Sequence, residues 1–182
     1  MPRVRPITGR DDVPIEYHAI VDDVLSVFGQ IRGPFSMLLY SPKLAERMLA
    51  LVKFNRGVTM VEPRLLSHAI LASVRERDAH YVWAAQVGAA RRADVPEATI
   101  DILRAKGDPA SLGEDERDII DYARQLVRTN RVDQTLFDRL QKRHGTQWLV
   151  ELTAAAGYFG MLAGVVNAFE VAAPPDGDKL PD

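Results

Sequence analysis

The chain of 182 residues contains no cysteine. This absence excludes disulfides, thiolate metal sites, iron–sulfur clusters and every peroxidase mechanism that uses a protein thiol. A chain without cysteine suits a reducing compartment, so we expect a cytoplasmic protein. Redox chemistry would need a borrowed cofactor, and the sequence contains no recognisable flavin, haem or nicotinamide site. We therefore expect no cofactor.

The chain also lacks an excess of charge of either sign, since 23 Lys and Arg residues face 25 Asp and Glu residues. A net charge of -2 offers no collective attraction to phosphate or anionic lipid, so we expect no nucleic-acid or membrane partner. The longest uncharged apolar run, residues 152–166, is shorter than the roughly 20 residues that a membrane span needs. We interpret it as part of a buried helix.

Strand patterns are missing as well, because no run of β-branched residues alternates with period two, whereas apolar residues repeat at helical spacing throughout. We predict a single all-α domain of about seven or eight helices over residues 15–172. Residues 1–14 are expected to form a loose arm, and the Pro- and Asp-rich residues 173–182 a flexible tail. The four histidines form no His-x-x-x-His or Glu-x-x-His pair, so no metal site is predicted.

Short patterns indicate where several helices begin. Ser41 precedes a proline and is predicted to cap the helix that follows it. Asp78 and Asp133 are predicted N-caps of two later helices. The last helix, residues 146–171, is apolar almost all round and rich in Ala and Gly. Small residues there would let another helix approach closely, in the same chain or in a partner.

Three ordered segments carry a family resemblance. They are GPFSMLLYSPKLAERMLAL, PRLLSHAILASVRERDAHYVWAAQVGAARRADVPEATI and LVELTAAAGYFGMLAGVVNAFEV. Their order and spacing resemble the carboxymuconolactone decarboxylase and alkyl hydroperoxidase D superfamily, over about residues 30–172. The resemblance implies an all-α fold and a homo-oligomer, which we expect to be a trimer, hexamer or dimer.

The reactive positions of that superfamily are not retained. In its peroxidase branch an acidic residue faces a Cys-x-x-Cys-x-x-x-His motif on the next helix. The resemblance places the acid at Ser67, the two cysteines at Ala79 and Val82, and the histidine at Gln86. A cysteine-less branch keeps a glutamate at the Val82 position and a histidine at the Gln86 position, and this chain departs from both. Hydroperoxide reduction by the family mechanism is therefore excluded.

Three polar residues remain as catalytic candidates. His80 would lie in the first helical turn, where the positive end of the helix dipole favours a neutral ring that can act as a general base. The Tyr81 hydroxyl could donate a hydrogen bond to a carbonyl or carboxylate group. Gln86 interrupts an apolar stripe and could position a substrate oxygen. Each residue also has a purely structural interpretation, as a surface histidine, a packed ring and a satisfied buried amide respectively.

Ser67, Trp83 and Arg75 are candidates for substrate binding. Ser67 is predicted to lie near Gln86, although it has no histidine at i+3 or i+4 to activate it as a nucleophile. Trp83 shares the inward stripe, where a core role is the simpler interpretation. Arg75 could hold a substrate carboxylate with two parallel hydrogen bonds, or form a solvated ion pair.

Two hypotheses about function follow. The first is a cofactor-free lyase or isomerase of the carboxymuconolactone decarboxylase type, acting on a small carboxylated or carbonyl compound. The second is a catalytically degenerate relative that acts as a binding or assembly protein. An open apolar pocket at the predicted site would favour the enzyme, and a site filled by Val82 and Trp83 would favour the binding protein.

Overall fold

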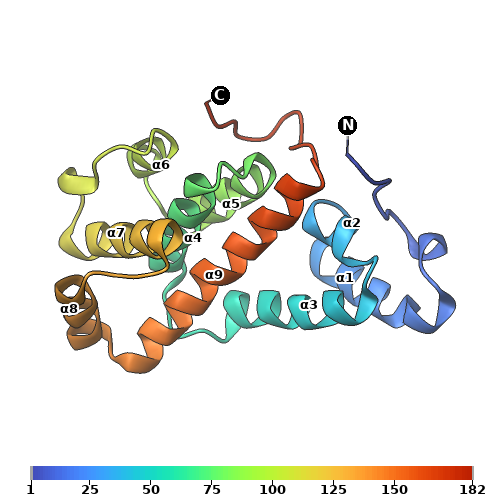
Figure 1. Ribbon diagram of the computed structural model, residues 1–182, viewed down its shortest axis with the longest axis horizontal. Helices are drawn as coiled ribbons and strands as arrows, with labels where there is room; N and C mark the ends of the chain where they lie inside the picture. The colour runs from blue at the N-terminus through green and yellow to red at the C-terminus, as the bar shows by residue number, and fades with distance from the viewer. Residues whose placement is uncertain (1, 182) are drawn as a thin grey trace.

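The computed structural model describes residues 2–181, and every regular element in this part of the chain is a helix (Figure 1). Residues 2–181 contain nine α-helices where the sequence indicates seven or eight, the additional one being the short helix at residues 34–38. In chain order they are α1 (His18–Phe28), α2 (Pro34–Leu38), α3 (Pro42–Gly57), α4 (Pro63–Glu76), α5 (His80–Arg92), α6 (Glu97–Arg104), α7 (Glu114–Thr129), α8 (Gln134–His144) and α9 (Thr146–Ala168).

Helix α4 lies at the centre of the fold and packs against α5, α7 and α9. Every residue from 68 to 75 is buried, as expected for a helix that has neighbours on all sides. In Figure 1, α9 crosses the molecule diagonally, with α1, α2 and α3 on one side of it and α6, α7 and α8 on the other. The hydrophobic core is continuous across these helices.

The helix starts agree with the sequence prediction only in part. The Asp133 carboxylate accepts hydrogen bonds from the amides of Thr135 (3.0 Å) and Leu136 (3.2 Å), which confirms it as the N-cap of α8. Ser41 does precede α3, but its hydroxyl makes no capping hydrogen bond. The proline that follows Ser41 takes the first helical position, where its missing amide hydrogen leaves one fewer unpaired donor at the helix start.

Both ends of the chain differ from the expected loose segments. In the arm, Ile7 and Val13 are buried, and the Ile7 amide donates to the Ser36 carbonyl at 3.0 Å. In the tail, Leu180 is buried and joins the hydrophobic core cluster. Apolar residues spaced widely in polar segments have no periodicity, which is why the sequence gives no sign of these contacts.

Helix α9 is long and apolar enough, by length and composition alone, to cross a membrane. More than half of its most apolar window, 56%, is buried inside the fold. It packs against α2, α4, α5, α7 and α8. These contacts support the sequence-based interpretation of α9 as a core helix.

Candidate functional site

The corner between α4 and α5 sets the direction of the helix that carries most candidate residues. The prediction that Asp78 caps α5 is wrong: the helix begins at His80, and Ala79 is its N-cap residue. Asp78 instead adopts a left-handed backbone with φ of +47°, which Asp tolerates better than most residues. Its carboxylate binds the Arg75 guanidinium and lies 3.1 Å from the Lys106 ammonium. The corner is therefore closed by ion pairs.

Arg75 has a structural role in this arrangement. Besides its ion pair with Asp78, its Nε donates to the backbone carbonyl of Arg104 at 2.6 Å. The residue is 8% exposed, so most of its guanidinium is committed to holding the α4–α5 corner against the end of α6. These bonds leave Arg75 little capacity to clamp a substrate carboxylate.

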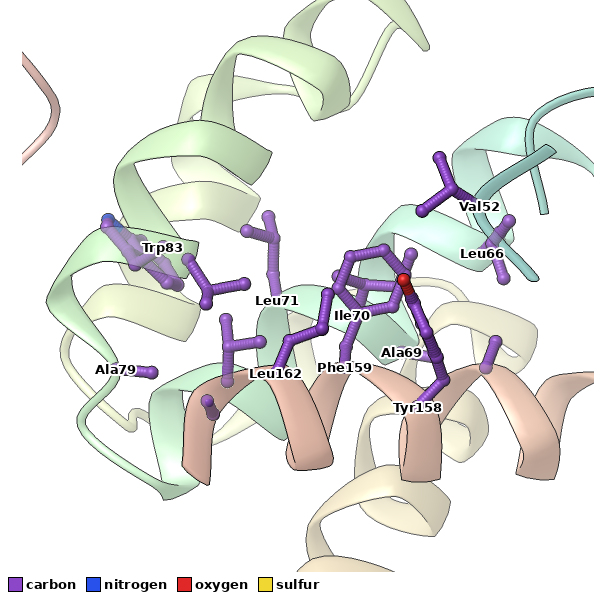
Figure 2. Close-up of a cluster of buried hydrophobic side chains, with 14 of the residues drawn as sticks. Val52, Leu66, Ala69, Ile70, Leu71, Ala79, Trp83, Tyr158, Phe159 and Leu162 are labelled. Atoms are coloured by element: carbon purple, nitrogen blue, oxygen red, sulfur yellow. The ribbon is translucent and has the colours of Figure 1, made fainter. Parts of the chain in front are cut away.

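The two positions that the family resemblance assigns to cysteines are packed. Ala79 is fully buried and Val82 is 3% exposed. Nearby, Leu71 of α4 and Phe159 and Leu162 of α9 point toward one another in the space between the helices (Figure 2). Apolar side chains therefore fill the space between α4, α5 and α9.

Trp83 is part of the same core. It is fully buried, and its indole N–H has no hydrogen-bond acceptor among residues 2–181. The Arg104 guanidinium carbon lies 5.9 Å from the centre of the Trp83 ring, within the range of a cation–π contact. The alternative interpretation of Trp83 as a core residue thus fits its surroundings.

Tyr81 points toward α2, and its ring lies directly on Gly33. A Cβ built at Gly33 would be 2.1 Å from Tyr81 Cε1, so no residue with a side chain fits there without displacing the ring. Gly33 also has φ of +59°, which glycine adopts readily. Burial raises the pKa of the Tyr81 hydroxyl, and the charge of Arg32 lowers it by a smaller amount. The hydroxyl therefore stays protonated and has no protein hydrogen-bond partner within residues 2–181.

The remaining candidates do not converge with Tyr81. His80 is exposed, and its imidazole makes no hydrogen bond or ion pair with any described residue. Gln86 is half-buried, and no side-chain bond of its amide occurs in the same part of the chain. Ser67 donates to the Pro63 carbonyl of its own helix at 2.7 Å. The six predicted residues therefore lie on two neighbouring helices without forming one hydrogen-bonded constellation.

His68 is a buried polar residue that the sequence analysis did not select. It is fully buried, its Nδ1 lies 2.7 Å from the Arg64 carbonyl, and its Nε2 has no hydrogen-bond partner in the described part of the chain. Glu116 Oε1 of α7 is 3.9 Å from Nε2, beyond hydrogen-bond distance, and Glu116 also pairs with Arg64. Burial lowers the His68 pKa, so the ring is neutral at pH 7.

A hollow of about 420 Å³ lies away from α5, between the N-terminal arm and the α2–α3 corner. Ile7, Tyr17 and Lys43 are among its lining residues. The Tyr40 hydroxyl donates to the Arg5 carbonyl at 2.7 Å and fastens the arm beside this hollow. The hollow therefore lies beside the N-terminal arm, whereas side chains fill the space between α4, α5 and α9.

No protein-family model matches the sequence, and no curated protein matches it. Several solved structures, in contrast, are similar to this chain. An uncharacterized peroxidase-related protein from Ralstonia eutropha, described as an alkylhydroperoxidase AhpD core, superimposes with a TM-score of 0.75 at 14% identity. The match covers 95% of each chain.

Two further structures are similar. The debrominase Bmp8, a variant with a cysteine replaced by alanine in complex with 2,3,4-tribromopyrrole, gives a TM-score of 0.73 at 17% identity, covering 96% of this chain and 95% of that one. A protein of unknown function from Agrobacterium tumefaciens, related to the antioxidant defence protein AhpD, gives 0.67 at 15% identity, covering 80% of this chain and all of that one. At such identities the likeness establishes architecture alone. The chain therefore has the alkyl hydroperoxidase D-like fold.

Proposed function

We propose that this chain is a non-catalytic protein of the alkyl hydroperoxidase D-like fold, which acts by binding and assembly. The observation that carries the proposal is the packing of Ala79, Val82 and Trp83 at and beside the family's reactive positions, where each is at most 3% exposed. Buried apolar side chains supply no group that can transfer a proton or attack a substrate. Ala79, Val82 and Trp83 stabilise the hydrophobic core instead.

The test is a comparison of turnover between the native chain and a variant that lacks the polar groups of His80 and Tyr81. Small unsaturated lactone acids and keto acids are offered to the native chain and to His80→Ala/Tyr81→Phe, and product is followed by mass spectrometry. We expect the same background rate from both proteins. Turnover by the native chain that disappears in the double variant would overturn the proposal.

A cofactor-free lyase or isomerase, acting on a small carboxylated or carbonyl compound, is the second candidate. Tyr81 favours it, because its protonated hydroxyl has no protein acceptor among residues 2–181 and Arg32 is close enough to affect its pKa. In this reaction Tyr81 and Arg32 would hold a substrate oxygen and His80 would move the proton. The debrominase of the same fold binds 2,3,4-tribromopyrrole, a small ring compound.

The assembly part of the proposal is a homo-oligomer formed through α9. One face of α9 is exposed and apolar at positions separated alternately by four and three residues, the spacing of a helix–helix seam. Val150 is 61% exposed and Met161 40% exposed, and small residues separate them. The seam consists of Val150, Ala154, Gly157, Met161, Gly164 and Ala168.

A charge placed on this seam tests the homo-oligomer. A Cβ added at Gly157 or Gly164 meets nothing within 4 Å, so Gly157→Glu and Gly164→Glu leave a single chain undisturbed. We expect the native chain to elute as an oligomer and both variants to elute as monomers in size-exclusion chromatography with light scattering. Ala110→Glu, on an exposed turn, is the matched control and should stay oligomeric. A native chain that is monomeric at every concentration contradicts the seam.

A further inference from the structure

We propose that the outer surface of α5 and α6 is a separate binding site for an extended peptide of another protein, in which a carboxylate precedes an aliphatic side chain by two residues. The chain's own tail binds this surface through Asp178, and Leu180 two residues later is buried, so the tail acts as an intramolecular competitor. The site involves none of the family's reactive positions. It therefore stands or falls independently of whether those positions are catalytic.

Two arginines recognise the carboxylate. Arg91 donates hydrogen bonds to the Asp178 carboxylate from both terminal nitrogens, at 2.6 Å (Nη1 to Oδ2) and 3.1 Å (Nη2 to Oδ1). Arg104 adds a third contact, from Nη2 to Oδ1 at 3.3 Å. A guanidinium that holds a carboxylate through two parallel hydrogen bonds recognises its geometry as well as its charge. The hydrogen bond from Arg91 is the main reason that the pKa of Asp178 is lowered.

Both arginines are held in place by other residues. Glu97 accepts two hydrogen bonds from Arg91, at 2.5 Å and 3.1 Å, and Asp101 pairs with Arg104. Their side chains thus have partners that orient them whether or not a carboxylate is bound. Such orientation reduces the conformational entropy that a ligand must overcome on binding.

The surface also selects the residues on each side of the carboxylate. A Cβ added at Gly177 would lie 2.8 Å from the Ala84 Cβ, so the backbone approaches α5 too closely for most side chains. Leu180 is 6% exposed and packs into the hydrophobic core cluster. Lys179 between these anchors is exposed. The ligand pattern is therefore Gly, acid, any residue, aliphatic residue.

The tail is attached mainly through these side chains. Among residues 172–181 the only backbone hydrogen bond runs from the Gly177 amide to the Pro174 carbonyl, within the tail itself. In Figure 1 the segment after α9 runs as an irregular strap past α5 toward α6. Segments with few buried contacts and exposed backbone open at low free-energy cost. A competing peptide can therefore replace the tail.

The test measures binding of a fluorescent nine-residue peptide, PPDGDKLPD, to full-length proteins by anisotropy. Asp178→Asn/Leu180→Ala releases the tail, and Asp176→Asn is the matched control, because Asp176 lies in the same tail but is exposed and has no ion pair among residues 2–181. We expect the released variant to bind at least tenfold more tightly than the native chain and the control. The same peptide with Asn in place of the residue equivalent to Asp178 should bind at least tenfold more weakly.

Two results overturn the proposal: equal binding to the native chain and the released variant, or no binding to any of them. Asp178→Asn alone repeats the experiment if Leu180→Ala impairs folding. Hydrogen exchange gives a second readout on the native chain, because the Gly177 amide donates to the Pro174 carbonyl and should exchange faster in Asp178→Asn but not in Asp176→Asn. Equal exchange of this amide in the native chain and in Asp178→Asn also overturns the proposal.

Discussion

The two faces of α5 have different physical characters. The inner face carries Val82 and Trp83, which are packed into the core together with the N-cap residue Ala79. The family resemblance assigns reactive groups to Ala79 and Val82. The outer face carries Arg91, whose guanidinium binds the carboxylate of Asp178. The comparison teaches that one helix can give its inner face to apolar packing and its outer face to ion pairs with a distant segment of the chain.

The largest expected effect tests the inner face. Trp83→Ala should lower the free energy of unfolding by about 3–5 kcal/mol, because it removes a fully buried aromatic side chain and leaves a cavity. Equilibrium denaturation in urea measures the change. A loss below about 1 kcal/mol would mean that the position is not tightly packed, and the contrast between the two faces would fail.

The second prediction concerns the contact between Tyr81 and Gly33. Gly33→Ala should cost roughly 1–3 kcal/mol, because the new Cβ overlaps the Tyr81 ring and the backbone has a positive φ. Gly9→Ala is the control, since a Cβ there meets nothing within 4 Å and φ is extended. If thermal unfolding shows the same midpoint for the two variants, the Tyr81 ring does not rest on Gly33.

The third prediction sharpens the comparison through two histidines, His68 in the core and His80 at the surface. Burial depresses the His68 pKa, so below pH about 6.5 the unfolded chain binds a proton that the folded chain does not. Neutral His68 therefore contributes fully to the free energy of unfolding above that pH. This contribution is lost as the pH falls toward the folded-state pKa of His68, because protonation then favours the unfolded chain.

Denaturation between pH 7 and pH 5.5 measures this effect. The native chain should lose stability over that interval, and His68→Gln should lose less, whatever its stability at pH 7. If the free energy of unfolding changes equally with pH in the native chain and in His68→Gln, the His68 pKa is the same in the folded and unfolded states.

The smallest effect is expected at the surface histidine. His80→Ala should change the free energy of unfolding by no more than about 0.5 kcal/mol, because His80 is exposed and has no partner among residues 2–181. The same urea experiment measures it. A loss above about 1.5 kcal/mol would show that His80 makes contacts that the structure does not contain.

The sequence was sufficient for the helical class, the single domain and most helix positions, because these depend on local periodicity and on starts such as Asp133. It could not predict the Asp78 corner, where ion pairs with Arg75 and Lys106 replace the expected capping bond. Nor could it predict which way Tyr81 faces, since that depends on Gly33, far away in the chain.

The tail shows the same limit. Its composition is that of a segment that cannot form a core, yet Leu180 is buried and Asp178 binds Arg91 and Arg104. These contacts join residues more than 70 positions apart, and no periodic pattern encodes them. Composition describes what a segment can do alone, whereas its placement depends on the surface that it meets.

The most direct test of the account is the solvent accessibility of Trp83. Trp148→Phe leaves Trp83 as the only tryptophan of the chain, and its fluorescence can be quenched by acrylamide. If side chains fill the space around Trp83, the folded variant should show blue-shifted emission and weak quenching, and quenching should become strong only on unfolding. Strong quenching of the folded variant would contradict the account, because it would show that an open cavity reaches Trp83.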